Sequence, residues 1–172
     1  MDRRLDRIRK DIVDLLPRLR RFARALTANA ADADDLVQDA VERALSRLHQ
    51  WEDGTRLDSW MFRIAKTVWI DKVRAAKVRR AEPLSDEEAS GAHDGARDAE
   101  ARLTFADTVQ AFGDLPEDQR VAVALIAIDG MSYRDAAEVL GVPIGTLTSR
   151  LARARIAMAE KITGEAGQGV LP

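Results

Sequence analysis

Six hydroxyl and guanidinium side chains in the C-terminal part of the chain could together read the bases of DNA. They belong to an amphipathic helix expected over about 145–162, whose inner face carries Leu147, Leu151 and Ala154. Arginine can donate two hydrogen bonds to guanine in the major groove, and serine or threonine can bond to several base edges. The residues that we predict to contact DNA are Thr146, Thr148, Ser149, Arg150, Arg153 and Arg155.

The residues before this helix predict a helix-turn-helix that would place it in the groove. Ser132 and Asp135 form a capping box at the start of a short helix, and the small Ala137 allows the two helices to approach closely. Gly141 can adopt the positive φ that a tight turn between helices requires. The alternative is an amphipathic hairpin with a solvated arginine face. The coincidence of glycine, alanine and the Thr/Ser/Arg face favours DNA binding.

A second basic element lies in the N-terminal half. A helix expected over about 59–80 has an apolar stripe that includes Trp60 and a strongly basic exterior, and the loop WEDGTRLD precedes it. Trp60 is expected in the core, whereas Trp69 stands outside the stripe and is expected to be exposed. The local charge also favours a basic surface in this half, because residues 1–80 hold 19 Lys and Arg against 13 Asp and Glu.

The hydrophobic pattern predicts helices in both halves of the chain and no strands. Apolar residues recur at spacings of three and four over about 5–26 and 33–48, and four further helices follow between about 103 and 162. Pro17 interrupts the first pattern, so it either kinks that helix or starts a new one.

The segment between the two halves is expected to be a linker. It contains Pro83, Gly91 and Gly95, few large apolar groups, and an excess of acidic residues. We predict an all-α protein of two small helical domains. Their bounds are 1–80 and 104–163, with a flexible acidic linker over 81–103 and a disordered tail over 164–172.

The composition excludes several classes of function. The chain has no cysteine and only two histidines, so we expect no disulfide, metal site or cofactor. We find no paired carboxylates, phosphate loop or nucleophile elbow, and therefore predict that the protein is not an enzyme. No apolar run approaches the roughly 20 residues that span a bilayer, and the charged N-terminus does not resemble a signal peptide. The cytoplasm is the expected compartment, without membrane insertion.

Two sequence blocks resemble one protein family. The run LPEDQRVAVALIAIDGMSYRDAAEVLGVPIGTLTSRLARAR resembles region 4 of extracytoplasmic-function (ECF) sigma factors of the sigma-70 family. Upstream, DADDLVQDAVERAL followed by LDSWMFRIAKTVWIDKVRAAKVRR resembles their region 2. The two blocks occur in the family's order and cover nearly the whole chain. The resemblance implies an alternative sigma factor that binds core RNA polymerase and directs promoter-specific transcription initiation.

The resemblance also implies roles for named residues. The helix expected over about 33–48, which contains the DADDLVQDA block, would dock on the β′ clamp helices of the polymerase through Asp34, Asp35 and Gln38. The basic helix and its loop would open and hold the minus-ten element, which requires cations and platforms for unstacked bases. The minus-ten candidates are Thr55, Arg56, Ser59, Arg63, Lys66 and Thr67.

In region 4, the arginines and hydroxyls described above would read the minus-thirty-five element, and the domain would contact the β flap. The family pattern often has a basic residue at the position of Thr148 and a larger residue at the position of Ala152, so base preference does not transfer from the family. Members of the family are usually held inactive by an anti-sigma factor, which we therefore expect as a partner.

Two rival functions remain at this point. One is a sigma-like decoy that sequesters an anti-sigma factor without binding promoters, and the other is an ordinary helix-turn-helix transcription regulator. The intact arginine face and basic helix disfavour the decoy, and the DADDLVQDA block disfavours the regulator. The sequence leaves open the inducing signal, the promoter sequence, the anti-sigma factor and the arrangement of the two domains.

Overall fold

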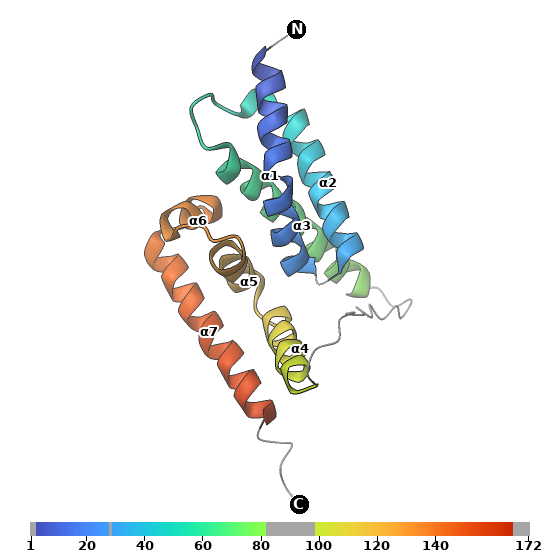
Figure 1. Cartoon of the computed structure of the whole chain (residues 1–172), viewed down its shortest axis with the longest axis vertical. Coiled ribbons are helices and arrows are strands. Elements are labelled where there is room, and N and C mark those ends of the chain that lie inside the picture. The colour runs from blue at the N-terminus through green and yellow to red at the C-terminus, as the bar shows by residue number, and fades with distance from the viewer. Residues whose placement is uncertain (1–2, 28, 82–98, 167–172) are drawn as a thin grey trace, which may run out of the picture.

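The N-terminal half folds into three long helices. The structure, a computed structural model, describes residues 3–27, 29–81 and 99–166, and all structural statements refer to these. Helix α1 spans Arg3–Thr27, α2 spans Ala30–Ser46 and α3 spans Leu57–Ala81, with a short 3-10 helix, η1, over Leu48–Gln50 (Figure 1).

The C-terminal half contains α4 (Ala99–Gly113), α5 (Glu117–Val123), a π-helical turn η2 (Ala124–Ile128), α6 (Tyr133–Leu140) and α7 (Ile144–Ala166). The predicted all-α class is confirmed, and the described residues form no strand. The helices extend further than we expected. Helix α4 begins inside the predicted linker, and α7 continues past position 162; the linker residues 82–98 and the tail residues 167–172 lie outside the described part.

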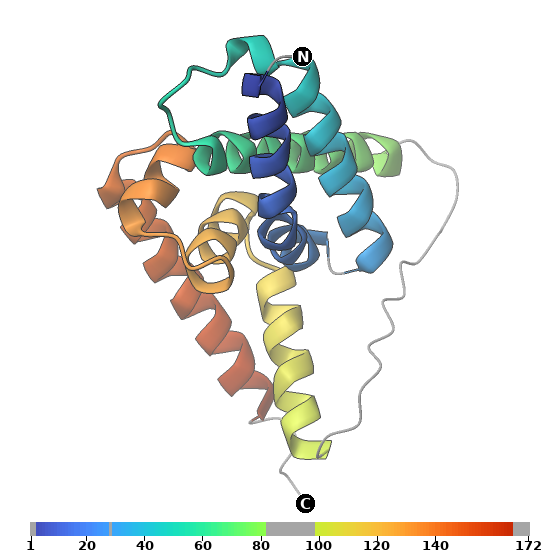
Figure 2. The ribbon, with the colours of Figure 1, turned by 45° about the horizontal axis from the view of Figure 1, so that its top comes forward.

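Helix α1 continues through its internal proline. A proline within a helix removes one backbone hydrogen bond and costs about 3 kcal/mol or more. Here Pro17 lies inside a single helix whose two halves run in different directions in Figure 2, so the proline bends α1 and does not start a new helix. Both halves remain anchored, because Ile12 before the bend and Leu19 after it are buried in the same core.

The remaining two long helices close the first domain around this core. The side chain of Asn29 accepts a hydrogen bond from the backbone amide of Asp32, which satisfies one free donor at the start of α2. Helices α1 and α3 meet through Phe22 and Phe62, whose rings pack edge to face with centroids 5.2 Å apart. This packing fixes which faces of α2 and α3 remain outside the core.

The second domain contains the predicted helix-turn-helix. The hydroxyl of Ser132 accepts a hydrogen bond from the Asp135 amide, as predicted for the start of α6. Gly141 ends α6 with φ 68° and ψ 36°, the left-handed conformation that a glycine adopts without strain. Beneath the turn, Ala137 and Leu147 are buried and hold α6 against α7.

The two domains pack against each other through a continuous core. Helix α3 contacts α6, and α1 contacts η2, so the second domain lies across one side of the first (Figure 2). Trp69 shows the effect: we expected it to be exposed, but only 3% of its surface is, because Arg120 of α5 covers its ring. Helix α3 is therefore buried on two sides, once by its own domain and once by the other.

Candidate nucleic-acid interface

Helix α7 presents most of its predicted DNA-contacting residues to solvent. Thr148, Ser149, Arg153 and Arg155 are exposed, while Leu147 and Ala154 are buried on the opposite side, as the helical spacing predicted. Thr146 is half-buried. This exposed polar face can enter a DNA major groove without any change in the fold.

Several of these side chains already have intramolecular partners. Thr148 Oγ1 donates to the carbonyl of Ile144 at 2.9 Å, and Arg153 Nε donates to the carbonyl of Ser149 at 3.3 Å. Arg150 is 21% exposed and pairs with Asp118 of α5 at 3.0 Å. Arg150 is therefore partly structural, and the guanidinium groups of Arg153 and Arg155 are the more accessible ones.

The minus-ten candidates before α3 and in its first turn differ in exposure. Thr55 and Arg56 lie in the exposed loop, and the Arg56 guanidinium donates to both carboxylate oxygens of Asp58, at 3.1 and 2.8 Å. Ser59 is 2% exposed, and its hydroxyl has no hydrogen-bond partner among the described residues. In this arrangement Ser59 is a buried helix residue that DNA does not reach.

The candidates further along α3 lie against the second domain. Arg63 donates to the backbone carbonyl of Glu138 at 3.2 Å, and Lys66 donates to that of Val139 at 3.3 Å. Both carbonyls belong to the last turn of α6, where the negative end of a helix favours cations. Thr67 is exposed but donates to the carbonyl of Arg63 within α3. Three of the six minus-ten candidates, Arg56, Arg63 and Lys66, therefore bond to α6, because Arg56 also pairs with Asp135.

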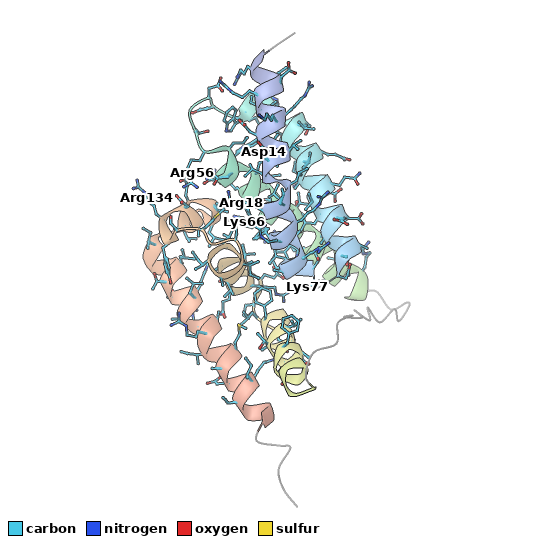
Figure 3. The ribbon with its side chains drawn as sticks, viewed as in Figure 1. Asp14, Arg18, Arg56, Lys66, Lys77 and Arg134 are labelled. Carbon is cyan, nitrogen blue, oxygen red and sulfur yellow. The ribbon has the colours of Figure 1, made fainter. Side chains whose placement is uncertain are left out.

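A residue that the sequence analysis did not consider lies at the centre of this contact. Arg18 of α1 donates to both carboxylate oxygens of Asp129, at 3.1 and 2.7 Å, and also to Asp58 at 3.4 Å. The side chain of Asp129 is fully buried, whereas that of Arg18 is 32% exposed. Figure 3 shows Arg18, Arg56 and Lys66 along the boundary between the two domains. The only sequence signal was an arginine near the apolar face of its helix.

The charges at this boundary shift one another's pKa values. Hydrogen bonds from Arg56 and then from Ser132 lower the pKa of Asp135. Burial lowers the pKa of Lys66, and the nearby cations of Arg63 and Arg150 lower it further. Lys66 is on α3 and Arg150 on α7, so candidate residues for both promoter elements lie near this boundary.

The predicted polymerase-docking residues lie on α2, and not on the two helices that carry the DNA candidates. Asp34, Asp35 and Gln38 are exposed on α2, as we expected. Asp34 and Gln38 border an open groove of about 640 Å³ between α1 and α2, which Arg20 and Arg24 also line. Asp34 lies 3.8 Å from Arg20. This groove has an apolar floor with charges of both signs at its edges, which suits a charged helical partner.

Two further observations limit the chemistry of the described residues. Within 3–27, 29–81 and 99–166, histidines and carboxylates nowhere gather in a group that could hold a metal ion. No helix in this part of the chain combines the length and the apolar character needed to cross a membrane.

Comparison with protein families identifies both domains. Residues 12–66 match the model described as the Sigma2 domain of PhyR, and residues 107–158 match the model described as Sigma-70, region 4. The two matches fall on the two helical domains. They include all the candidate residues of α2 and α7 and those of α3 except Thr67, which lies one position past the first match. Their order along the chain is the one that the resemblance implied.

Curated relatives match most of the chain. The ECF RNA polymerase sigma factor EcfG of Rhodopseudomonas palustris is 38% identical over 154 residues, covering 87% of this chain and 82% of the relative. The ECF sigma factor SigC of Mycobacterium tuberculosis is 35% identical over 136 residues, covering 78% and 72%.

Solved structures show the same arrangement of helices. The sigma factor RpoE of Bartonella quintana, in complex with the anti-sigma factor NepR, matches with a TM-score of 0.70 and 32% identity over 90% of this chain and 96% of RpoE. CnrH, in complex with the cytosolic domain of CnrY, matches with a TM-score of 0.67 and 25% identity over 91% of this chain and 88% of CnrH. With relatives above 30% identity over most of their length, the chain belongs to the extracytoplasmic-function family of RNA polymerase sigma factors, the alternative sigma factors that direct transcription.

Proposed function

We propose that this sigma factor binds core RNA polymerase through α2, opens and holds the minus-ten element with α3, and reads the minus-thirty-five element with α7. The observation that carries the proposal is the exposed Ser, Thr and Arg face of α7, placed by the turn at Gly141. A helix with this face fits the major groove, where its guanidinium groups can reach guanine or phosphate.

The polymerase surface in this proposal is the exposed edge of α2. Asp34, Asp35 and Gln38 would meet the β′ clamp helices, while the second domain would meet the β flap. Support comes from the groove between α1 and α2, whose apolar floor and mixed charges suit a partner helix. The relatives named above are RNA polymerase sigma factors, so core polymerase is the expected partner of this chain too.

An anti-sigma factor is also part of the proposal. The structures of RpoE and CnrH contain NepR and the cytosolic domain of CnrY, respectively, so proteins with this fold bind such regulators. We propose that this chain has a regulator of that class, that it works in the cytoplasm, and that it has no catalytic activity of its own.

Run-off transcription tests the proposal directly. Purified core polymerase is mixed with fragmented DNA from the genome of the source organism, with and without the protein. We expect discrete new transcripts that fall more than tenfold when Arg153 and Arg155 are both changed to Ala, because these are the most exposed guanidinium groups on α7. The matched control changes two exposed cations at the far end of α1, Arg9 and Lys10, to Ala and should leave the transcripts unchanged.

A binding assay separates the proposed function from its rivals. Core polymerase should bind the native chain, and the double change Asp34→Asn with Asp35→Asn should weaken that binding at least fivefold. Core binding without transcripts would favour the decoy that sequesters an anti-sigma factor. The absence of core binding would favour an ordinary helix-turn-helix regulator and overturn the proposal.

A further inference from the structure

The N-terminal part of α7 carries an uncharged stripe beside its arginines. Ile144, Thr148 and Ala152 are all exposed, and their spacing of four places them along one side of the helix. Ile144 is the first residue of α7 and is 49% exposed, although its side chain is fully apolar. We call these three residues the methyl stripe. The stripe is about 12 Å long, which corresponds to about three to four base pairs of a duplex.

The hydroxyl of Thr148 does not give the stripe a free hydrogen-bond donor. Its Oγ1 donates to the carbonyl of Ile144 at 2.9 Å, so the one donor of this side chain is used within the helix. The exposed part of Thr148 therefore offers its methyl group to a partner. Ile144 and Ala152 have only aliphatic carbon to offer, so the stripe contacts a partner through methyl and methylene groups.

The position of the methyl stripe favours contact with bases. A single exposed apolar side chain is common on protein surfaces and needs no functional explanation. Here the stripe starts at the N-terminal end of the helix that follows the turn at Gly141, and this end of a recognition helix meets the base edges. Helix α7 runs along the outer edge of the structure, where a duplex can approach it (Figure 1).

Thymine is the base whose major-groove edge matches such a stripe. It presents a C5 methyl group in the groove, and apolar contacts from alanine or from the methyl group of threonine recognise it. Cytosine has a hydrogen at that position and an amino donor, which would lose its water without gaining an acceptor from the aliphatic groups. Guanine needs donors, which Arg153 and Arg155 carry on a different part of the helix.

We infer that the methyl stripe determines specificity: Ile144, Thr148 and Ala152 contact thymine methyl groups in the minus-thirty-five element and select A·T pairs there. The inference rests on the proposed role of α7 in reading that element. The arginines supply affinity through phosphates and guanine edges, and the stripe discriminates between bases at the positions beneath it.

Replacing thymine by uracil tests the inference, because this change removes the C5 methyl group and keeps the base pairing. The probe is a promoter duplex recovered by run-off transcription, and the protein is the full chain bound to core polymerase. With 2′-deoxyuridine in place of every thymidine of the minus-thirty-five element, we expect binding to weaken about fourfold for each contacted methyl group. The same replacement in the spacer between the two elements is the control and should change binding less than twofold.

Two variants assign the uracil effect to the stripe. Ile144→Ala removes most of the largest side chain, and Thr148→Ser removes one methyl group while it keeps the hydroxyl that bonds to the Ile144 carbonyl. Each should bind the thymine duplex more weakly and be at least twofold less sensitive to uracil than the native chain. The matched control is Thr163→Ser at the far end of α7. Thr163 is also exposed and donates to the carbonyl of Ala159 at 2.7 Å, and its variant should keep the full uracil effect.

Equal binding of the thymine and uracil duplexes, together with loss of binding when Arg153 and Arg155 are changed to Ala, would overturn the inference and leave the proposed function standing. A recovered element without thymine on either strand would do the same. A uracil effect of equal size in the native chain, Ile144→Ala and Thr148→Ser would also overturn the inference, because the methyl groups would then act through DNA shape or another residue. A complex that binds no promoter duplex and gives no transcripts would overturn the proposed function and the inference with it.

Discussion

The two proposed DNA surfaces of this sigma factor carry similar residues in opposite environments. On α7, Arg153 and Arg155 are exposed, and the two hydroxyls beside them bond only within their own helix. On α3, Arg63 and Lys66 bond to the last turn of α6, in the other domain. The difference teaches that residue type identifies a cationic surface but does not show whether the surface is open.

The comparison also separates two roles for a cation. An exposed arginine contributes to DNA binding at all times, through counterion release and hydrogen bonding. A cation of α3 that bonds to α6 is available to DNA only after the two domains separate. Until then it stabilises the closed form, in which the two domains pack against each other. Changes that weaken closure should therefore make the α3 surface resemble the α7 surface.

Removing Arg18 should produce the largest change in the equilibrium between the closed and open arrangements of the two domains. Arg18→Ala leaves the buried carboxylate of Asp129 without its two-point partner, a loss that costs about 3 kcal/mol for a buried pair with one partly exposed member. Because separation of the domains would expose Asp129 to water, we expect opening and not global unfolding. Energy transfer between dyes on Lys10→Cys and Glu160→Cys should report a lower closed fraction.

The matched control for this prediction is Arg9→Ala, which removes an exposed arginine of the same helix that lies 3.8 Å from Asp6. It should leave the energy transfer unchanged. Loss of helical circular dichroism in Arg18→Ala, in step with the loss of energy transfer, would contradict opening and show that the pair stabilises the fold itself.

Acid should open the domains by a related route. The hydrogen bond from Arg56 lowers the pKa of Asp135 in the closed form, so this form binds fewer protons at Asp135 than the open form. Closure is therefore fully supported above the ordinary aspartate pKa of about 3.9 and weakens as pH falls below it. The groups that face Asp135 are Arg56, Asp58 and Ser132. Energy transfer should fall before helical circular dichroism does in a titration from pH 6 to 3.

Asp135→Asn should reproduce part of this effect at neutral pH. The amide keeps the shape of the carboxylate but removes its charge, and Arg56 retains its bonds to Asp58. Since both partners are partly exposed, we expect closure to weaken by at most about 1 kcal/mol. Asp6→Asn, which changes the net charge equally, is the control. An equal change in the closed fraction for both variants would assign the effect to net charge and contradict a specific role of the Arg56–Asp135 pair.

Glu138→Gln should have the smallest effect, although it removes an acidic residue of α6 at the boundary between the domains. Arg63 bonds to the backbone carbonyl of Glu138 at 3.2 Å, whereas the carboxylate is 4.0 Å away and 55% exposed. We expect a change of a few tenths of a kcal/mol in the closed fraction. A change as large as that of Asp135→Asn would show that charge alone, and not the geometry of the contacts, holds the two domains together.

The local parts of the fold were predictable from the sequence. The helix-turn-helix follows from short-range signals, the cap at Ser132, the glycine at 141 and the apolar spacing of α7, and the structure confirms each of them. The family resemblance predicted both domains and their order, which the family comparison confirms. The role of each candidate residue in binding DNA or polymerase remains a prediction.

The contacts between the domains were not predictable in the same way. Arg18 and Asp129 are 111 positions apart, and no periodicity links them. Trp69 was expected to be exposed because one apolar stripe of α3 accounted for the core of its own domain. The packing of a second domain against another side of the same helix leaves no local signal in the sequence. Ser59 was a minus-ten candidate at the expected start of a helix, but α3 begins two residues earlier and Ser59 is buried in its first turn.

The π-helical turn η2 makes the position of Asp129 sensitive to the length of the chain. Across this turn the amide of Asp129 bonds to the carbonyl of Ala124, five residues earlier, in place of the four of an α-helix. Deleting one residue from Ala124–Ile128 would restore the α-helical register and rotate the carboxylate by about 100° away from Arg18. A lineage could therefore gain or lose the contact between the domains through a single codon, without altering any residue that we propose to read a promoter.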